Sequence, residues 1–229
     1  MKTFKILGLL LSYPQPEWLS HLDEFEALLK EEGFLPRKAL HAVLGFIEAL
    51  KAEDLYSLQE TYVSIFDRGR GHSLHLFEHI HGESRDRGQA MVNLAAAYEA
   101  KGFFIDRAEL PDYLPLFLEF LSLGPADEGV KLLAEPIDIM ATIGARLQKR
   151  DSSYAVLFDA LVALSRVKPS QEKIQAVLEQ EPEENSLEAL DKEWEEAAAF
   201  AGQPLKSGCG GCTAAAGNLQ IKINQSGGI

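Results

Sequence analysis

Hydrophobic side chains recur at spacings of three and four residues along most of the chain, which is the period of an amphipathic α-helix. In residues 16–33 this spacing places four apolar side chains, from Trp18 to Leu29, on one face, and Gly33 follows at the end of the segment. The same pattern predicts further helices at residues 36–51, 55–67, 84–102, 112–123, 127–149, 152–166, 170–180 and 186–200. Alternation of period two, which is typical of strands, is nearly absent outside residues 219–223. We therefore predict an all-α protein, a single compact bundle of roughly nine or ten helices.

The chain is predicted to form one helical domain, residues 1–201, followed by a flexible C-terminal tail, residues 202–229. The connections between the predicted helices are short and rich in glycine, proline or charge, and no repeat of solenoid length is found. From Gly202 onward the sequence is poor in charged and large apolar residues and rich in Gly, Ala and Ser. Such a segment cannot bury enough apolar area to offset the entropy that it would lose on ordering.

The formal net charge of the chain is -13 at pH 7, which bears on its partners. Nucleic-acid binding needs a basic surface, so nucleic acid is disfavoured as a partner, whereas a basic or amphipathic peptide suits an acidic protein. The apolar run at residues 6–11 is too short for a secretory signal and is predicted to be a first core helix. No later segment approaches the ~20 uncharged apolar residues of a membrane-spanning helix. We expect a cytoplasmic protein without stable membrane insertion.

Four histidines cluster between residues 72 and 81 and raise the question of a metal site. His72, His75 and His79 have the spacing i, i+3 and i+7, which would place them on one face of a helix, and imidazole is a common zinc ligand. The segment lacks the His-x-x-x-His pair with an intervening Glu, and glycines flank it. Metal binding at these histidines therefore stays an alternative to histidines that are satisfied at a junction between helices.

The two cysteines, Cys209 and Cys212, form a C-x-x-C motif in the predicted tail, the spacing of a zinc half-site or a redox dithiol. A structural zinc site needs four ligands, so these two would require a second chain or borrowed histidines. The sequence also contains no Gly-x-Ser-x-Gly element and no phosphate-binding glycine loop. We predict neither a catalytic residue nor a cofactor, and treat a metal or thiol redox protein as the rival interpretation.

Residues 109–120, ELPDYLPLFLEF, allow two interpretations of one loop and helix start. Asp112 could cap the helix that follows, with Pro115 in the first turn, where its missing N–H costs little. Alternatively, the loop lines a groove in which Asp112 and Tyr113 contact a bound basic peptide. The residues themselves leave both interpretations open.

Residues 60–103 carry a series of short elements in a characteristic order: Tyr62, Phe66-Asp67-Arg68, Ser73-Leu74-His75-Leu76, His81-Gly82, Arg85, Arg87-Gly88 and the segment 98–103. Together with residues 109–121 and Trp194-Glu195-Glu196, this order resembles the nitrate reductase delta subunit family, the NarJ-type molybdoenzyme assembly chaperones. The resemblance spans most of residues 1–200 and leaves the tail uncovered.

The resemblance implies an all-helical cytoplasmic chaperone that is not an enzyme. It would bind the apo catalytic (alpha) subunit of respiratory nitrate reductase, in part through the N-terminal signal-like peptide of that subunit. It would assist molybdenum cofactor insertion before membrane docking, with proteins of molybdenum cofactor biosynthesis as candidate further partners. The expected peptide-binding residues are Tyr62, Phe66, Asp67, His75, Pro111, Asp112, Tyr113 and Glu119.

One position departs from the pattern of the wider family. Related chaperones carry a Pro-x-Asp-His element in the loop between helices, and the matching positions here are Pro111, Asp112 and Tyr113. The imidazole is thus replaced by a phenol, which leaves an aromatic contact and a hydrogen bond available but removes an ionisable imidazole.

Overall fold

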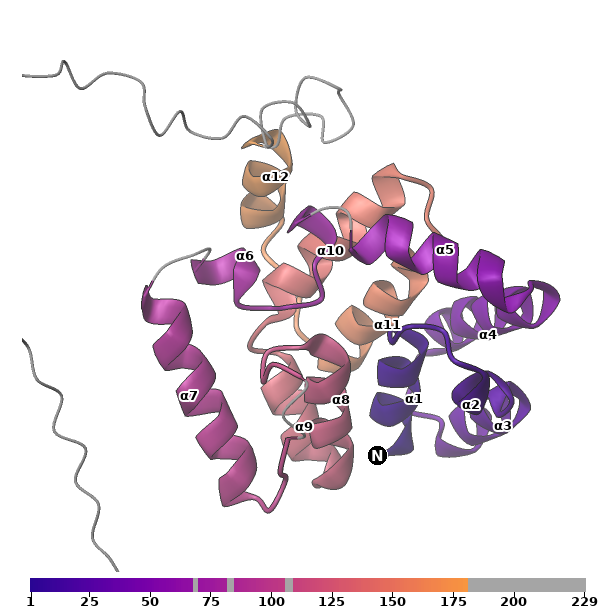
Figure 1. The fold of residues 1–229 in the computed structure, drawn as a ribbon, viewed down its shortest axis with the longest axis horizontal. Helices are drawn as coiled ribbons and strands as arrows, with labels where there is room; N and C mark the ends of the chain where they lie inside the picture. Colours follow the sequence, from indigo (N-terminus) through magenta and orange to yellow (C-terminus); the bar gives the residue numbers. More distant parts are fainter. Residues whose placement is uncertain (68–69, 82–84, 106–108, 181–229) are drawn as a thin grey trace, which may run out of the picture. The chain divides into compact units, whose positions relative to one another are not determined.

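The computed structural model describes residues 1–67, 70–81, 85–105 and 109–180. Within these ranges the structure holds twelve α-helices and one 3-10 turn, and it contains no strand beyond one isolated bridge (Figure 1). The prediction of an all-α bundle is confirmed, since ten of these helices have eight residues or more. The elements in order are α1 (Lys2–Leu10), α2 (Pro16–Leu19), α3 (Leu22–Glu32), α4 (Arg37–Ala52), α5 (Leu55–Phe66), η1 (Arg70–His72), α6 (Glu78–His81), α7 (Arg85–Ala100), α8 (Leu114–Leu123), α9 (Ala126–Leu133), α10 (Ile137–Lys149), α11 (Ala155–Ser165) and α12 (Gln171–Gln180).

The predicted helix at residues 186–200, the domain boundary after residue 201 and the Cys209–Cys212 motif lie outside the described residues. Two predicted helices are each divided in the structure, so their predicted continuity was wrong. The segment 127–149 breaks between α9 and α10 at Pro136, which has no N–H to continue a helix. The segment 16–33 breaks after α2, where the Ser20 hydroxyl donates to the carbonyl of Glu17 and so competes with the next helical hydrogen bond.

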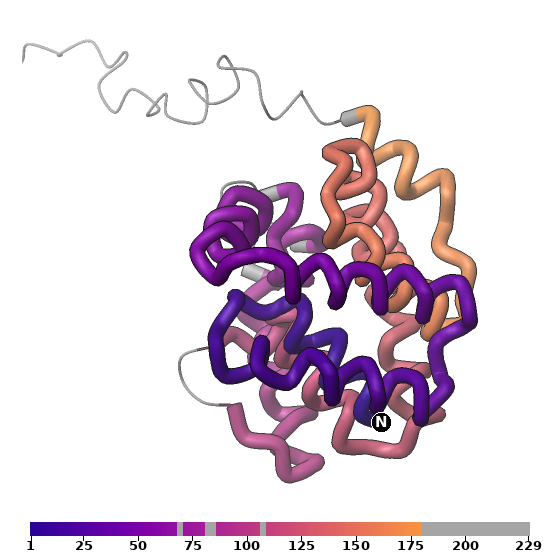
Figure 2. Tube along the Cα trace, turned by 90° about the vertical axis from the view of Figure 1, so that its right-hand side faces the viewer, coloured from indigo at the N-terminus to yellow at the C-terminus, as the bar shows by residue number. Residues whose placement is uncertain are grey.

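The bundle is built around α1 and α8, which pack along each other, and around α10 and α11. A Cβ at Gly8 would lie 3.0 Å from the carbonyl oxygen of Pro115 and 3.3 Å from Cβ of Leu118, so the glycine permits this close approach. The buried apolar side chains form one continuous core, to which nearly every helix contributes. In both views α12 extends from one end of the bundle, where it packs on α10 (Figures 1 and 2).

A carboxylate from α3 caps the N-terminus of α1. Glu32 accepts hydrogen bonds from the backbone N–H groups of Lys2 and Thr3 and from the Thr3 hydroxyl, each at 2.7 Å. Helix N-termini leave such N–H groups without intrahelical partners, and a carboxylate near them also complements the helix dipole. This cap joins two helices 30 residues apart in the sequence.

Replacing Glu32 by alanine should lower the free energy of unfolding by about 1 to 2 kcal/mol, the usual cost of a lost N-cap. Burial acts to raise the pKa of Glu32, but the hydrogen bonds from Thr3 and from the two backbone N–H groups outweigh it, and the pKa is lowered. The contribution is therefore present above the unfolded pKa and is lost as the pH falls through the folded pKa. Urea unfolding of both proteins at neutral and acidic pH tests this, and an equal difference at both would refute it.

Candidate functional site

Two segments far apart in the sequence pair side by side at the surface of the bundle. The backbone N–H of Leu76 donates to the carbonyl of Asp112 at 3.1 Å, and the N–H of Leu114 donates to the carbonyl of Leu74 at 2.8 Å. These bonds flank an isolated antiparallel bridge between His75 and Tyr113, whose rings stack in a tilted arrangement 5.4 Å apart. The pairing thus joins the predicted histidine segment to the predicted loop.

Asp112 holds this pairing together from beneath. None of its surface is exposed, and its carboxylate accepts from the backbone N–H of Phe77 at 3.0 Å and faces Nδ1 of His75 at 3.2 Å. Tyr113, not Asp112, occupies the N-cap position of α8, and its side chain makes no capping hydrogen bond. The interpretation of Asp112 as a helix cap is therefore wrong, because its carboxylate turns inward to the opposite segment.

The pairing forms one wall of a pocket of about 320 Å³, which we call the α5 pocket. The C-terminal turn of α5 forms the floor. Five of the eight predicted peptide-binding residues line this pocket, together with four that the prediction did not include. The lining residues are Tyr13, Tyr62, Phe66, Asp67, Ser73, Leu74, His75, Glu109 and Tyr113.

Tyr62 and Phe66 form the floor of the α5 pocket instead of projecting into solvent. They are 4% and 7% exposed, and each packs edge-to-face against Tyr154 of the core. The Tyr62 hydroxyl donates to the carbonyl of Leu11 at 3.0 Å and lies 3.3 Å from the Tyr113 hydroxyl. Burial raises the pKa of Tyr62, so its hydroxyl stays a neutral donor. The accessible aromatic surface comes mainly from Tyr113 and from Tyr13, which is 39% exposed.

Two exposed carboxylates lie at the rim of the α5 pocket. Within the described part of the chain, neither Asp67 nor Glu109 has an ion-pair partner or a side-chain hydrogen bond. Glu109 opens the segment ELPDY, and its position in this acidic loop was the one sequence signal that could have identified it. The rim is therefore suited to a cationic group beside an aromatic surface.

The three remaining predicted residues lie elsewhere. Pro111 accepts a hydrogen bond at its carbonyl from the hydroxyl of Tyr98, at 2.9 Å, and thereby ties the loop to α7. Asp112 is buried beneath the pocket, as described above. Glu119 pairs with Lys5 at 3.1 Å and lines a neighbouring pocket. A direct contact of these residues with a peptide stays a prediction.

His75 gives the site a pH-dependent contribution to stability. The hydrogen bond to Asp112 raises the pKa of His75 above its ordinary value, although partial burial opposes this. A raised folded pKa stabilises the folded state below the unfolded pKa of about 6.5, and this stabilisation is lost as the pH rises through the folded pKa.

The free energy of unfolding of the wild type minus that of His75→Gln should therefore be larger at about pH 5.5 than at about pH 8.5. Burial lowers the pKa of His79, so His79 contributes to stability with the opposite pH dependence. Both proteins retain His79, so its contribution cancels when one free energy of unfolding is subtracted from the other. Urea unfolding at the two pH values measures it. A difference that grows with pH would contradict the pairing of His75 with Asp112.

The three histidines of the metal alternative each engage a separate partner. Nδ1 of His72 lies 3.4 Å from the Arg150 guanidinium, and His75 faces Asp112. Nε2 of His79 lies 2.8 Å from the carbonyl of Ser73. Among the described residues no group of three His, Cys, Asp or Glu side chains is arranged to hold a metal ion. In this structure His72 and His75 join the segment 72–79 to other parts of the chain, and His79 bonds within it.

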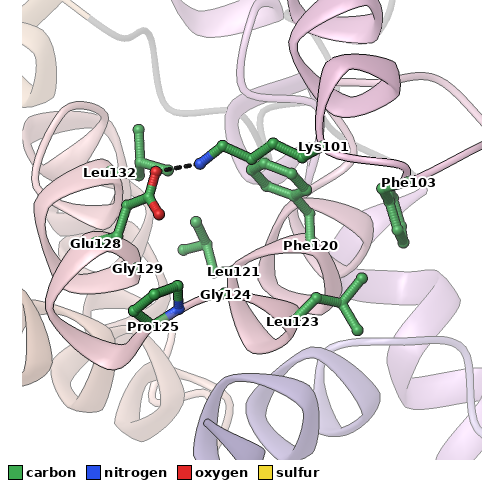
Figure 3. A pocket seen from close by; sticks show the side chains of 10 residues that line it. All are labelled: Lys101, Phe103, Phe120, Leu121, Leu123, Gly124, Pro125, Glu128, Gly129 and Leu132. Atoms are coloured by element: carbon green, nitrogen blue, oxygen red, sulfur yellow. Dashed lines mark hydrogen bonds and ion pairs between the residues drawn. The ribbon is translucent and has the colours of Figure 1, made fainter.

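A larger and more apolar pocket, of about 380 Å³, lies between the end of α7, α8 and α9 (Figure 3). Lys101 reaches across it to an ion pair with Glu128 and lies over the Phe120 ring, 5.5 Å from its centroid. Leu123 lines its rim with 68% of its surface exposed. This α9 pocket contains none of the predicted peptide-binding residues, and it supplies a matched control surface for mutagenesis.

A search of the helices in the described ranges finds none that is both long and apolar enough to cross a membrane.

Comparison with known proteins places the chain in a family. Residues 30–160, more than half of the chain, match the model of the family described as nitrate reductase delta subunit. The "Nitrate reductase molybdenum cofactor assembly chaperone NarJ" of Escherichia coli K12 is 44% identical over 192 residues, which are 83% of this chain and 81% of that protein. The "Probable nitrate reductase molybdenum cofactor assembly chaperone NarJ" of Bacillus subtilis is 35% identical over 161 residues, 70% of this chain and 86% of the relative.

A solved structure supports the fold. The crystal structure described as that of "A Putative Redox Enzyme Maturation Protein From Archaeoglobus Fulgidus" superposes with a TM-score of 0.52 at 23% identity, over 69% of this chain and 89% of that one. The relatives are named as assembly chaperones and not as enzymes. The order of motifs in residues 60–103, the helical bundle and the family match agree, and the chain belongs to the nitrate reductase delta subunit family.

Proposed function

We propose that this protein is a dedicated chaperone of respiratory nitrate reductase. It binds the apo catalytic subunit through the N-terminal signal-like peptide of that subunit, and holds it in the cytoplasm for molybdenum cofactor insertion before membrane docking. Family membership supports the chaperone role, since a relative named as a nitrate reductase molybdenum cofactor assembly chaperone is 44% identical to the chain.

The α5 pocket is the proposed peptide site, and one observation carries this assignment. Five residues that the resemblance nominated, from α5, the segment 73–77 and the segment 110–114, converge on a single pocket. Its aromatic lining, from Tyr13, Tyr62, Phe66 and Tyr113, suits the apolar face of a helix, and helix-in-groove recognition is a common mode of peptide binding. Asp67 and Glu109 at the rim suit a basic residue beside that face.

Calorimetric titration of the full chain with a peptide copying the N-terminus of the catalytic subunit, from the same organism, tests the proposal. One-to-one saturable binding is expected, weakened by added salt only in its electrostatic part. A scrambled peptide of the same composition is the control. If neither low nor high salt gives binding above that control, peptide recognition by this chain is refuted.

The rival function, a metal or thiol redox protein using Cys209 and Cys212, predicts a different result. Stoichiometric zinc or iron would be retained by the purified protein and lost in the double variant Cys209→Ser and Cys212→Ser. Metal analysis of both proteins separates this rival from the chaperone.

A further inference from the structure

A second pocket, of about 170 Å³, adjoins the α5 pocket. We call it the α1 pocket, because Gly8 and Leu9 of α1 form one wall, while Pro115 and Leu116 of α8 form the other. Tyr113 and Glu109 line both pockets. The two cavities are therefore separated by little more than one aromatic side chain.

Tyr113 is held as a fixed ridge between the two pockets. Its backbone N–H donates to the carbonyl of Leu110 at 3.1 Å, and its hydroxyl lies 3.3 Å from that of Tyr62. The ring also stacks on His75, which Asp112 holds in turn. With contacts at the backbone, the ring face and the hydroxyl, the ridge does not depend on a bound ligand for its position.

The pocket sizes suit separate side chains of one ligand. A cavity of ~150 Å³ accommodates benzene in a well-studied case, so the α1 pocket has room for one large apolar side chain. The α5 pocket, of about 320 Å³, has nearly twice the volume of the α1 pocket, of about 170 Å³. On a helix, side chains three or four positions apart have Cβ atoms roughly 5 to 6 Å apart, which matches two cavities divided by one ring.

A carboxylate beside Tyr113 indicates that the ligand also carries a basic residue. Glu119 at the rim of the α1 pocket is already paired with Lys5. Glu109, which lines both pockets, is exposed and has no ion-pair partner among the described residues. A basic residue of a ligand that spans the ridge would therefore be attracted to Glu109.

We infer that the α5 and α1 pockets are two subsites of one helix-binding groove. The client helix inserts two apolar side chains, three or four positions apart, on either side of Tyr113, and places a basic residue beside Glu109. This inference rests on the proposed function and defines the sequence pattern that its ligand must carry.

The experiment is a calorimetric double-mutant cycle with the N-terminal peptide of the catalytic subunit. Each apolar peptide residue is replaced in turn by alanine and titrated against the wild type and against Leu116→Trp, which fills the α1 pocket. Leu123→Trp, at the rim of the α9 pocket on the same helix, is the matched control. If circular dichroism shows that Leu116→Trp is misfolded, Leu116→Ala, paired with Leu123→Ala, replaces it in the cycle.

For one apolar peptide residue, we expect that replacement by alanine weakens binding of the peptide to the wild type at least tenfold. The same replacement should hardly change binding of the peptide to Leu116→Trp, because the α1 pocket is already filled there. Replacing a second apolar peptide residue, three or four positions away, should weaken binding to both proteins by a similar factor, because this residue occupies the α5 pocket. If the wild type binds the peptide but every truncation has the same effect in both proteins, the α1 pocket is not a subsite and the inference is overturned while the proposed function stands. If the wild type does not bind, both are overturned.

The charge at the ridge is tested in the same way. Glu109→Gln should weaken peptide binding about two- to fivefold at low salt, and should do so only while the basic peptide residue is present. Glu53→Gln is the control with the same charge change, since Glu53 precedes Asp54, the N-cap of α5. The helix separates Asp54 from Phe66 by roughly 18 Å, which exceeds the screening length of about 10 Å at 0.1 M salt, the low-salt condition of this titration. An equal effect of Glu109→Gln on a peptide without the basic residue would refute the role of Glu109.

Discussion

Replacing Asp112 by alanine is expected to lower the free energy of unfolding by about 3 kcal/mol, the largest effect that we predict for a single residue of the site. The carboxylate is completely buried and serves two groups, the backbone N–H of Phe77 and the imidazole of His75. Alanine would leave the N–H of Phe77 without its acceptor and would leave His75 without its counter-charge. A buried group that loses its partner costs about 1 to 3 kcal/mol, and because His75 and Phe77 are only partly buried, we expect the lower half of that range for each.

Urea unfolding followed by circular dichroism measures this loss. Asp112→Asn is the matched variant, because its amide oxygen can still accept from Phe77 while the charge facing His75 is gone. It should lose about half as much stability. If Asp112→Ala unfolds at the wild-type urea concentration but no longer binds the peptide, Asp112 contacts the ligand directly and the positioning role is wrong.

Replacing Tyr113 by alanine is expected to weaken binding of the catalytic-subunit peptide about thirtyfold, the size of a typical interface hot spot. The Tyr113 ring lines both pockets, so its removal takes contact area from both apolar side chains of the ligand at once. Tyr113→Phe keeps the ring and loses only the hydroxyl, which lies 3.3 Å from that of Tyr62. The phenylalanine variant should therefore bind within about threefold of the wild type.

Calorimetry of the three proteins with the same peptide distinguishes ring from hydroxyl. Leu123→Ala, at the α9 pocket, controls for a general effect of removing surface side chains from α8. Wild-type affinity in Tyr113→Ala would exclude this groove as the peptide site. A loss confined to Leu123→Ala would move the site to the α9 pocket.

The helical architecture could be read from the sequence because helical periodicity is a local property. Trp18, Leu22, Phe25 and Leu29 are all buried, as the spacing in residues 16–33 predicts. The break of that segment after α2 was missed because it depends on one hydroxyl, that of Ser20, which bonds to the preceding turn. The break at Pro136 was visible in the sequence, but the apolar spacing on either side of the proline concealed it.

The sequence identified part of the lining of the candidate site, and peptide binding by these residues stays a prediction. The motif order singled out Tyr62, Phe66, Asp67, His75 and Tyr113, and these converge on the α5 pocket. The motif order does not show how deeply each side chain is buried. Tyr62 and Phe66 form the floor of the pocket, and Asp112 is completely buried beneath it. Tyr13 was missed because nothing near it in the sequence distinguishes it from any aromatic residue at a helix end.

The sequence by itself determined the fold class, the acidic character and the family, since periodicity, composition and the order of motifs need no knowledge of distant contacts. Only the tertiary structure decided which residues line the α5 pocket, how Asp112 is used and that Glu32 caps α1. The bridge between His75 and Tyr113 and the hydrogen bond from Phe77 to Asp112 each join residues more than 30 positions apart. Such contacts arise from the packing of rigid helices such as α1 and α8, and local patterns along the chain do not encode their geometry.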